Sequence, residues 1–260
     1  MPDEPFIRVR NLKHRFGSHE VLRGINLDIH RGETLVLLGG SGAGKSVLLK
    51  LLPGLLKPTS GTIHIEDTEI SCLNERQLGS IRKKVGMMFQ GGALFDSMSV
   101  GQNVAFPLRE GGIRDENEIT TRVDRALSIV RLNEQQNKMP ADLSGGMRKR
   151  VALARAVVDR PACVLYDEPH AGLDPITADT IDHMIRDLQH NHGMTNVVVT
   201  HEMRSVFHIA DRVLFLKDGQ IAWEGSPAEL QSTSDPELRA FISGDSGEAW
   251  PENPVTPAHR

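Results

Sequence analysis

A glycine-rich stretch near residue 40 carries the residue types that hold a phosphate group. It reads GGSGAGKS and comprises Gly39, Gly40, Ser41, Gly42, Ala43, Gly44, Lys45 and Ser46. Glycines let backbone N–H groups point inward at oxygen atoms without a Cβ in the way. The spacing predicts a loop for a nucleoside triphosphate, in which Lys45 reaches the β and γ phosphates and the Ser46 hydroxyl ligates Mg²⁺. A flexible turn is the alternative, and it leaves the Lys-Ser pair after an apolar strand unexplained.

Two adjacent carboxylates, Asp167 and Glu168, follow the apolar run CVLY. A buried strand that ends here places them at the carboxyl edge of a sheet, where open α/β sheets bind their ligands. Asp167 is then expected to hold Mg²⁺, directly or through water, and Glu168 to polarise the attacking water. An acidic pair that only opens the next loop is the alternative, and the nearby phosphate loop argues against it.

Two more polar residues end strand-like runs. His201 follows NVVVT, where an imidazole can contact a γ-phosphate and orient water, and Gln90 closes KVGMMFQ, where its amide can join Mg²⁺ and the water. Taken alone, each is weak, because one of eleven histidines is more often structural and a single glutamine carries little signal.

A second glycine-containing turn precedes the helical pattern RKRVALARAVV. It reads LSGGM and comprises Leu143, Ser144, Gly145, Gly146 and Met147. A Ser-Gly-Gly turn at a helix N-terminus also suits an anion, because its free N–H groups and the helix dipole favour negative charge. One chain therefore carries two loops suited to phosphate, about a hundred residues apart.

The apolar pattern predicts the elements that position these residues. Strands are expected over residues 6–16, 21–30, 33–40, 61–67, 162–169 and 195–202. A helix follows the first loop and stops near Pro53-Gly54, another covers 176–191, and a hairpin over 212–225 turns at Asp218-Gly219. The result is an α/β fold.

Residues 91–143 are expected to form a mostly helical insert. One helix face is predicted from the spacing of Ile119, Val123, Ala126, Leu127 and Val130.

Composition argues against several classes of protein. The formal net charge of −4 argues against a dedicated nucleic-acid binder, and no run of about 18 apolar residues is present. The N-terminus has no apolar signal region, and Cys72 and Cys163 do not make a disulfide framework, so a reducing cytoplasm is expected. Cys163 is expected in the core. From Gly244 onward the composition is typical of an unstructured tail.

The segments GGSGAGKS, FQ, LSGGM, LYDEP, AGLD and VTHE occur in the order found in ATP-binding cassette (ABC) ATPases, which the chain resembles from about residue 5 to 243. The resemblance implies a P-loop NTPase cassette. Its expected parts are an N-terminal antiparallel β subdomain, a RecA-like α/β core and an α-helical subdomain over 91–143. Residues 244–260 would form a tail that can reach the partner protomer.

The same resemblance explains the two loops. It implies that two such chains stack head to tail as a homodimer, in which LSGGM of one chain contacts the γ-phosphate bound by the other. It also implies that Phe16 stacks on adenine, although a core position for Phe16 is an equal alternative. Asp174 would couple the two sites at the dimer interface, and Gln90 would link the nucleotide to the insert and to a membrane permease.

Two positions depart from the usual family pattern. Residue 170 is histidine, where many cassettes have threonine or serine, and residue 147 is methionine, where many have glutamine. Neither change removes a catalytic group, so an ATPase is still expected. The intact Lys45, Asp167, Glu168 and His201 argue against a catalytically silent regulator.

The segments FQGGALFDSMSVGQNVAFPLRE and DEPHAGLDPITADTIDHMI resemble ATPases of bacterial phospholipid-trafficking transporters of the Mla type. This implies phospholipid transport at the cytoplasmic face of the inner membrane, with a permease, an MCE-domain protein and a small STAS-type subunit as partners and no nucleic acid. The apolar residues of Gln90–Glu110, which carry most of this signal, are also compatible with ordinary core. A cassette for a polar solute, or a soluble cassette acting on DNA or ribosomes, are the alternatives.

Overall fold

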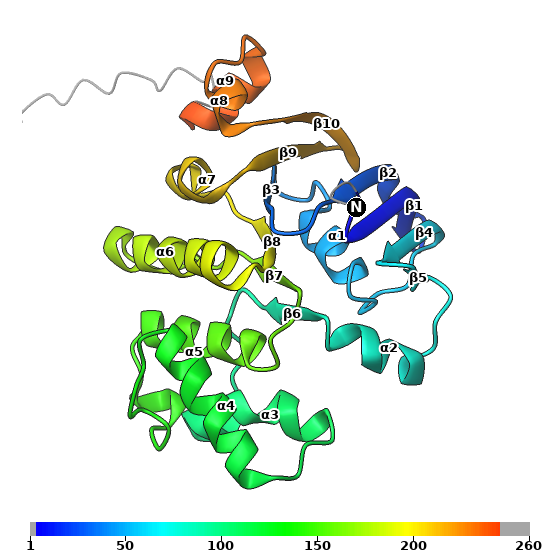
Figure 1. Ribbon diagram of the computed structural model, residues 1–260. Coiled ribbons are helices and arrows are strands. Elements are labelled where there is room, and N and C mark those ends of the chain that lie inside the picture. The colour runs from blue at the N-terminus through cyan, green and yellow to red at the C-terminus, as the bar shows by residue number, and fades with distance from the viewer. Residues whose placement is uncertain (1–3, 245–260) are drawn as a thin grey trace, which may run out of the picture. The chain divides into compact units, whose positions relative to one another are not determined.

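Figure 1 presents a computed structural model of the chain, which describes residues 4–244. The contacts between Cα atoms divide the chain into two compact units, Met1–Pro227 and Ala228–Arg260. The tail expected over 244–260 lies outside the described residues from position 245 onward.

The first unit contains the strands and most of the helices. Its strands are β1 (Ile7–Phe16), β2 (His19–Ile29), β3 (Thr34–Gly39), β4 (Ser60–Ile65), β5 (Thr68–Glu69), β6 (Val85–Met88), β7 (Cys163–Asp167), β8 (Thr195–Val199), β9 (Arg212–Lys217) and β10 (Gln220–Gly225). Its helices are α1 (Lys45–Leu51), α2 (Glu75–Arg82), α3 (Val100–Glu110), α4 (Glu116–Ile129), the 3₁₀ turn η1 (Pro140–Asp142), α5 (Gly145–Val157), α6 (Pro175–His192) and α7 (Met203–Ile209).

The strands form two sheets. The antiparallel sheet has the order β2-β1-β4-β5, and the six-stranded sheet has the order β10-β9-β3-β8-β7-β6, which is parallel apart from the β9–β10 pair. Every residue of β3, β7 and β8 is buried. Figure 1 shows α1 and α6 on opposite sides of these strands. Because both faces of the strands are covered, their sequences are continuous apolar runs and do not alternate with polar residues.

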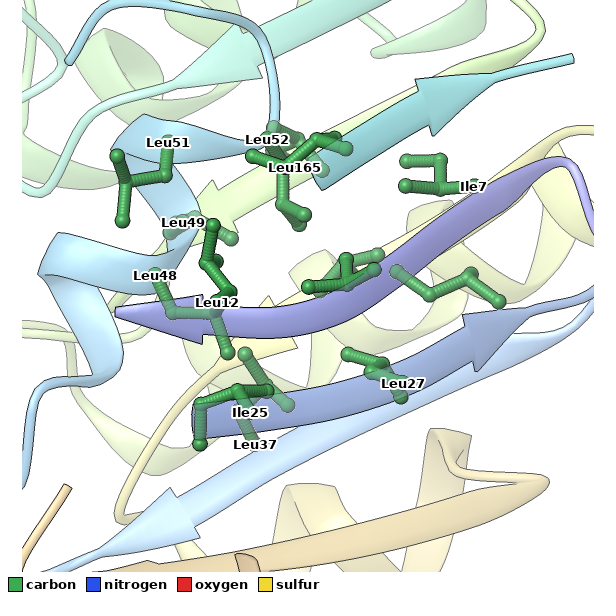
Figure 2. Close-up of a cluster of buried hydrophobic side chains, with 14 of the residues drawn as sticks. Ile7, Leu12, Ile25, Leu27, Leu37, Leu48, Leu49, Leu51, Leu52 and Leu165 are labelled. Atoms are coloured by element: carbon green, nitrogen blue, oxygen red, sulfur yellow. The ribbon is translucent and has the colours of Figure 1, made fainter. Parts of the chain in front are cut away.

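One hydrophobic cluster fixes the position of α1. Figure 2 shows Leu48 and Leu49 near Leu12 of β1, and Leu52 near Leu165 of β7. All three, and Leu51 on the same helix, are fully buried. Burial of each leucine contributes about 2 kcal/mol to folding. Since α1 begins at Lys45, this packing also fixes the loop that precedes it.

The helical subdomain expected over 91–143 contains α3 and α4. These two helices contact each other and α5, which follows the subdomain, and all three lie beyond the β6 edge of the larger sheet in Figure 1. The predicted apolar face is confirmed, because all five of its residues are buried. Residues 91–99 precede the first of these helices as irregular backbone and turns, and Ser99 and Gln102 form a capping box at the start of α3.

The predicted stop of the first helix near Pro53-Gly54 is confirmed, because α1 ends at Leu51 and Gly54 has a φ of +70°. Helix α2 was not expected, because only Leu78 and Ile81 are buried in it and its apolar pattern is short. The hairpin turn at Asp218-Gly219 is confirmed, with φ values of +49° and +75°. Cys163 is buried as predicted.

The second unit holds α9 (Pro236–Ser243), and α8 (Pro227–Gln231) begins at the unit boundary. The side chain of Asp235 accepts hydrogen bonds from the backbone of Glu237 and Leu238, which caps the start of α9. Within residues 4–244, no helix combines the length and the apolarity needed to cross a membrane.

Candidate nucleotide-binding site

The loop between β3 and α1 requires glycine at both of its ends. Gly39 has a φ of +146°, and a Cβ there would lie 2.2 Å from the carbonyl oxygen of Leu216. Gly44 has a φ of +101°, and its Cβ would lie 2.7 Å from Leu22. Both positions combine left-handed backbone with close packing, so the glycine spacing follows from the fold of the loop.

The ammonium group of Lys45 lies over this loop. Its Nζ donates to the carbonyl oxygens of Gly39 at 2.7 Å and of Gly40 at 2.9 Å. Burial lowers the pKa of Lys45, while the charges of Glu168 and Asp167 act in the opposite direction. A half-buried cation held by a glycine loop attracts a phosphate strongly, because little solvent screens it.

Ser46 and Asp167 are brought together from positions 121 residues apart. The Ser46 hydroxyl donates to Oδ1 of Asp167 at 3.0 Å. Asp167 ends β7 as predicted and is buried. A hydroxyl and a carboxylate are the hard oxygen ligands that Mg²⁺ prefers. Within residues 4–244, no three His, Cys, Asp or Glu side chains are grouped as a metal site.

Glu168 and His201 form a contact directly beyond the sheet edge. Nδ1 of His201 lies 2.9 Å from Oε2 of Glu168, and the imidazole is exposed while the carboxylate is largely buried. The N–H of Glu168 donates to the carbonyl of Val199 at 2.9 Å, which ties the residue to the end of β8. In this arrangement the Glu168 carboxylate can take a proton from a water molecule while the His201 imidazole lies beside it.

Sequence reasoning missed Lys149, which connects the helical subdomain to these residues. It lies in α5, is buried, and donates to the carbonyl oxygen of Gln90 and, at 3.2 Å, to that of Glu168. Burial lowers the pKa of Lys149, and Glu168 and Asp167 oppose this effect. The sequence did contain a clue to its burial: Lys149 stands one helical turn before Leu153, on the apolar side of α5. Gln90 itself lies just beyond the end of β6.

The second loop lies at the start of α5. Ser144 is its N-cap and accepts a hydrogen bond from the N–H of Met147 at 3.2 Å, while Leu143 is buried. A Cβ on Gly146 would lie 2.4 Å from Cγ2 of Thr177, so the N-terminal turns of α5 and α6 are in close contact. Ser144 and Gly145 are exposed to solvent.

Asp174 and Phe16 lie at the surface. Asp174 caps α6 and accepts hydrogen bonds from the hydroxyl of Thr177 at 2.6 Å and from the backbone of Ile176 and Thr177. The Thr177 hydroxyl holds the pKa of Asp174 below its usual value. Phe16 is 53% exposed and touches the ring of His14 edge-on at 4.7 Å between centroids. The core alternative for Phe16 is therefore wrong.

The fold and this arrangement of residues define an ATP-binding cassette. A family model described as "ABC transporter" matches residues 22–171, so the chain belongs to the ABC transporter family and is its ATP-hydrolysing subunit. The dimeric cassette MJ0796, solved in a post-hydrolysis state with ADP and Pi, is 32% identical, with a TM-score of 0.79 over 85% of this chain and 98% of that one.

Two curated relatives indicate different cargoes. The chain is 37% identical to the intermembrane phospholipid transport ATP-binding protein MlaF of Haemophilus influenzae, over 94% of this chain and 92% of that protein. It is 40% identical to the methionine import ATP-binding protein MetN of Brucella abortus strain 2308, over 85% of this chain and 60% of that protein.

Proposed function

We propose that this chain drives a transporter that moves phospholipids between the inner and outer membranes. The observation that carries the proposal is the match to the phospholipid transport relative, which spans nearly all of both chains. The methionine import relative is slightly more similar but leaves two fifths of its own length unmatched. The polar-solute alternative rests on that relative.

The hydrolytic step is assigned to the residues gathered at the sheet edge. The loop from Gly39 to Ser46 binds the phosphates, and Lys45 neutralises the β and γ groups. Glu168 takes a proton from the attacking water, and His201 orients that water against the γ-phosphate. Mg²⁺ would be held by Ser46, Asp167 and Gln90, and it would neutralise charge on the phosphates.

The ATP site is completed by a second copy of the chain. Leu143–Met147 of one protomer would contact the γ-phosphate held by the other, and Phe16 would stack on the adenine. The exposed Ser144 and Gly145 at the start of α5 support this role, as does the contact between α5 and α6, which brings Asp174 to the same surface. The solved relative is dimeric, which supports a pair of chains.

A groove of about 990 Å³ supports a docking place for the membrane permease. Its apolar lining includes Phe89, Phe95, Phe106 and Pro107, and α2 and α3 contribute to its walls. Five of its lining residues belong to Gln90–Glu110, the segment that resembles phospholipid-trafficking ATPases: Ala93, Phe95, Phe106, Pro107 and Glu110. The partners in this proposal are a permease, an MCE-domain protein and a STAS-type subunit, with the cassette peripheral at the cytoplasmic face of the inner membrane. No nucleic acid takes part.

The domain layout in this proposal has three parts. Residues 5–243 form the cassette, 91–143 its helical subdomain, and 244–260 a tail that can reach the partner protomer.

An affinity purification tests the cargo and the groove together. The tagged chain is recovered from detergent-solubilised native membranes, and co-eluting proteins and lipids are identified by mass spectrometry. A permease, an MCE-domain protein and phospholipid are expected, and recovery of a solute permease alone would contradict lipid transport.

A matched pair of variants tests the groove. Phe95→Glu, within the groove, is expected to lose the permease, and Phe207→Glu, on α7, to keep it. Phe95 is 40% exposed and Phe207 37%, so both changes add a charge at a similar surface position. A permease retained by Phe95→Glu would contradict the groove assignment.

A further inference from the structure

The histidine that departs from the usual family pattern lies inside a buried chain of hydrogen bonds. His170 stands two residues beyond Glu168 and is only 6% exposed. Its Nε2 lies 2.7 Å from Oδ1 of Asp182 on α6, and its Nδ1 lies 3.4 Å from Oγ1 of Thr200. An ionised carboxylate only accepts hydrogen bonds, so Nε2–H donates to Asp182. In the neutral imidazole Nδ1 is then the acceptor, and the Thr200 hydroxyl donates to it.

The chain of contacts continues into the turn that carries His201. Oγ1 of Thr200 accepts the backbone N–H of Glu202 at 3.1 Å. His201 lies between these two residues and contacts Glu168 through its imidazole at 2.9 Å. These contacts form a closed path through Glu168, His170, Thr200 and His201, which we call the circuit. Glu168 and His170 are joined by the backbone, and His170 is joined to the His201 turn through the Thr200 hydroxyl.

The set of carboxylate, imidazole and hydroxyl resembles a nucleophilic triad in its residue types, but its burial excludes that role. Thr200 is 1% exposed and Asp182 is 2% exposed. A nucleophile has to reach the substrate, and this hydroxyl is enclosed. Its oxygen also accepts the N–H of Glu202, so its hydrogen bonds hold the backbone in place.

We propose that His170 is a positioning residue for ATP hydrolysis. Through Thr200 it fixes the turn that holds His201 against Glu168, and through Asp182 it anchors that turn to α6. A short hydroxyl side chain at position 170 would not reach both partners in the same way, because the imidazole offers two ring nitrogens on opposite sides. The proposal rests on the proposed roles of Glu168 and His201 in hydrolysis and is independent of the transported cargo.

The test compares two threonines at opposite ends of β8: Thr195 is its first residue, and Thr200 directly follows its last. Thr200→Val removes the hydroxyl of the circuit and keeps the side-chain shape. Thr195→Val is the matched control, because Thr195 is also 1% exposed and its Oγ1 accepts the backbone N–H of Gly32 at 3.0 Å, at the other end of the strand. The kcat, the KM for MgATP and the thermal unfolding of the full chain are measured for each variant.

Thr200→Val is expected to lower kcat about tenfold with KM changed less than about twofold, because misplacing a catalytic group impairs the transition state more than substrate binding. Thr195→Val is expected to lose comparable stability with kcat retained. Thr200→Ser restores the hydroxyl and is expected to recover most of kcat. Equal loss of kcat in Thr195→Val, or no recovery in Thr200→Ser, would overturn the proposal.

A second comparison uses the histidine directly. His170→Ala is expected to lower kcat to the level of Thr200→Val, and the double variant to fall no further, because both changes break the same circuit. Losses that multiply in the double variant would show that the two residues act separately and would contradict the proposal. Should His170→Ala fail to fold, the three threonine variants decide the matter alone.

Discussion

Glu168 has a backbone conformation that residues other than glycine rarely adopt. Its φ is +49°, which places it in the left-handed region immediately after β7. Its N–H bonds to Val199, its carbonyl accepts Lys149, and its carboxylate contacts His201. Strained residues persist where the surroundings fix them, and they cluster at functional sites. At the scale of single residues, Glu168 is therefore the strongest candidate for the base.

Replacing Glu168 with glutamine tests that assignment. The amide keeps the size of the side chain but cannot take a proton from water, so we expect turnover to fall at least a hundredfold while ATP binding is retained. Steady-state hydrolysis and nucleotide binding measure the two effects. Glu202→Gln makes the same change on an exposed side chain in the neighbouring turn and should hydrolyse ATP normally. Wild-type turnover in Glu168→Gln would remove Glu168 from the role of base.

At the scale of elements, α5 connects three parts of the site. Its N-terminus presents Ser144, and its buried Lys149 contacts the carbonyls of Gln90 and Glu168. The adjacent Arg150 points to a different region, because its guanidinium lies near the carbonyls of Val130 and Arg131. Lys149 thus connects α5 to the catalytic loops, and Arg150 connects the same helix to the segment that follows α4.

Lys149→Met removes the ammonium group and keeps the length of the side chain. We expect kcat to fall about tenfold with the ATP dissociation constant unchanged, because the positions of Gln90 and Glu168 are loosened while the phosphate loop is untouched. Arg150→Met is the matched control and should keep kcat within about twofold. Both are measured by hydrolysis and by equilibrium nucleotide binding. If the two variants lose the same activity, the effect comes from α5 as a whole and not from the Lys149 contacts.

At the scale of the whole molecule, the second loop and Asp174 share one exposed surface. The first turns of α5 and α6 touch, and Ile176 beside them is 81% exposed. Helix N-termini suit a phosphate, and the proposed dimer would cover Ile176 beside them.

We expect Glu168→Gln to form a stable dimer in MgATP, since ATP is bound but not hydrolysed. Adding Ser144→Arg should abolish that dimer by placing a bulky side chain against the partner's nucleotide, with ATP still bound to each monomer. Sedimentation velocity measures the dimer, and a nucleotide-binding assay confirms the bound ATP. If the double variant still dimerises, residues 143–147 lie outside the interface.

The sequence by itself determined the local chemistry of the site. Loop spacing identified Gly39–Ser46, and apolar runs placed Asp167, Glu168 and His201 at strand ends, because both patterns depend on neighbouring residues. Tertiary structure alone decided that Phe16 is exposed, that Lys149 contacts Gln90 and Glu168, and that His170 bonds to Thr200 and Asp182. These contacts join residues 12 to 59 positions apart, and no periodicity in the chain records which distant partners the packing of helices against the sheet brings together.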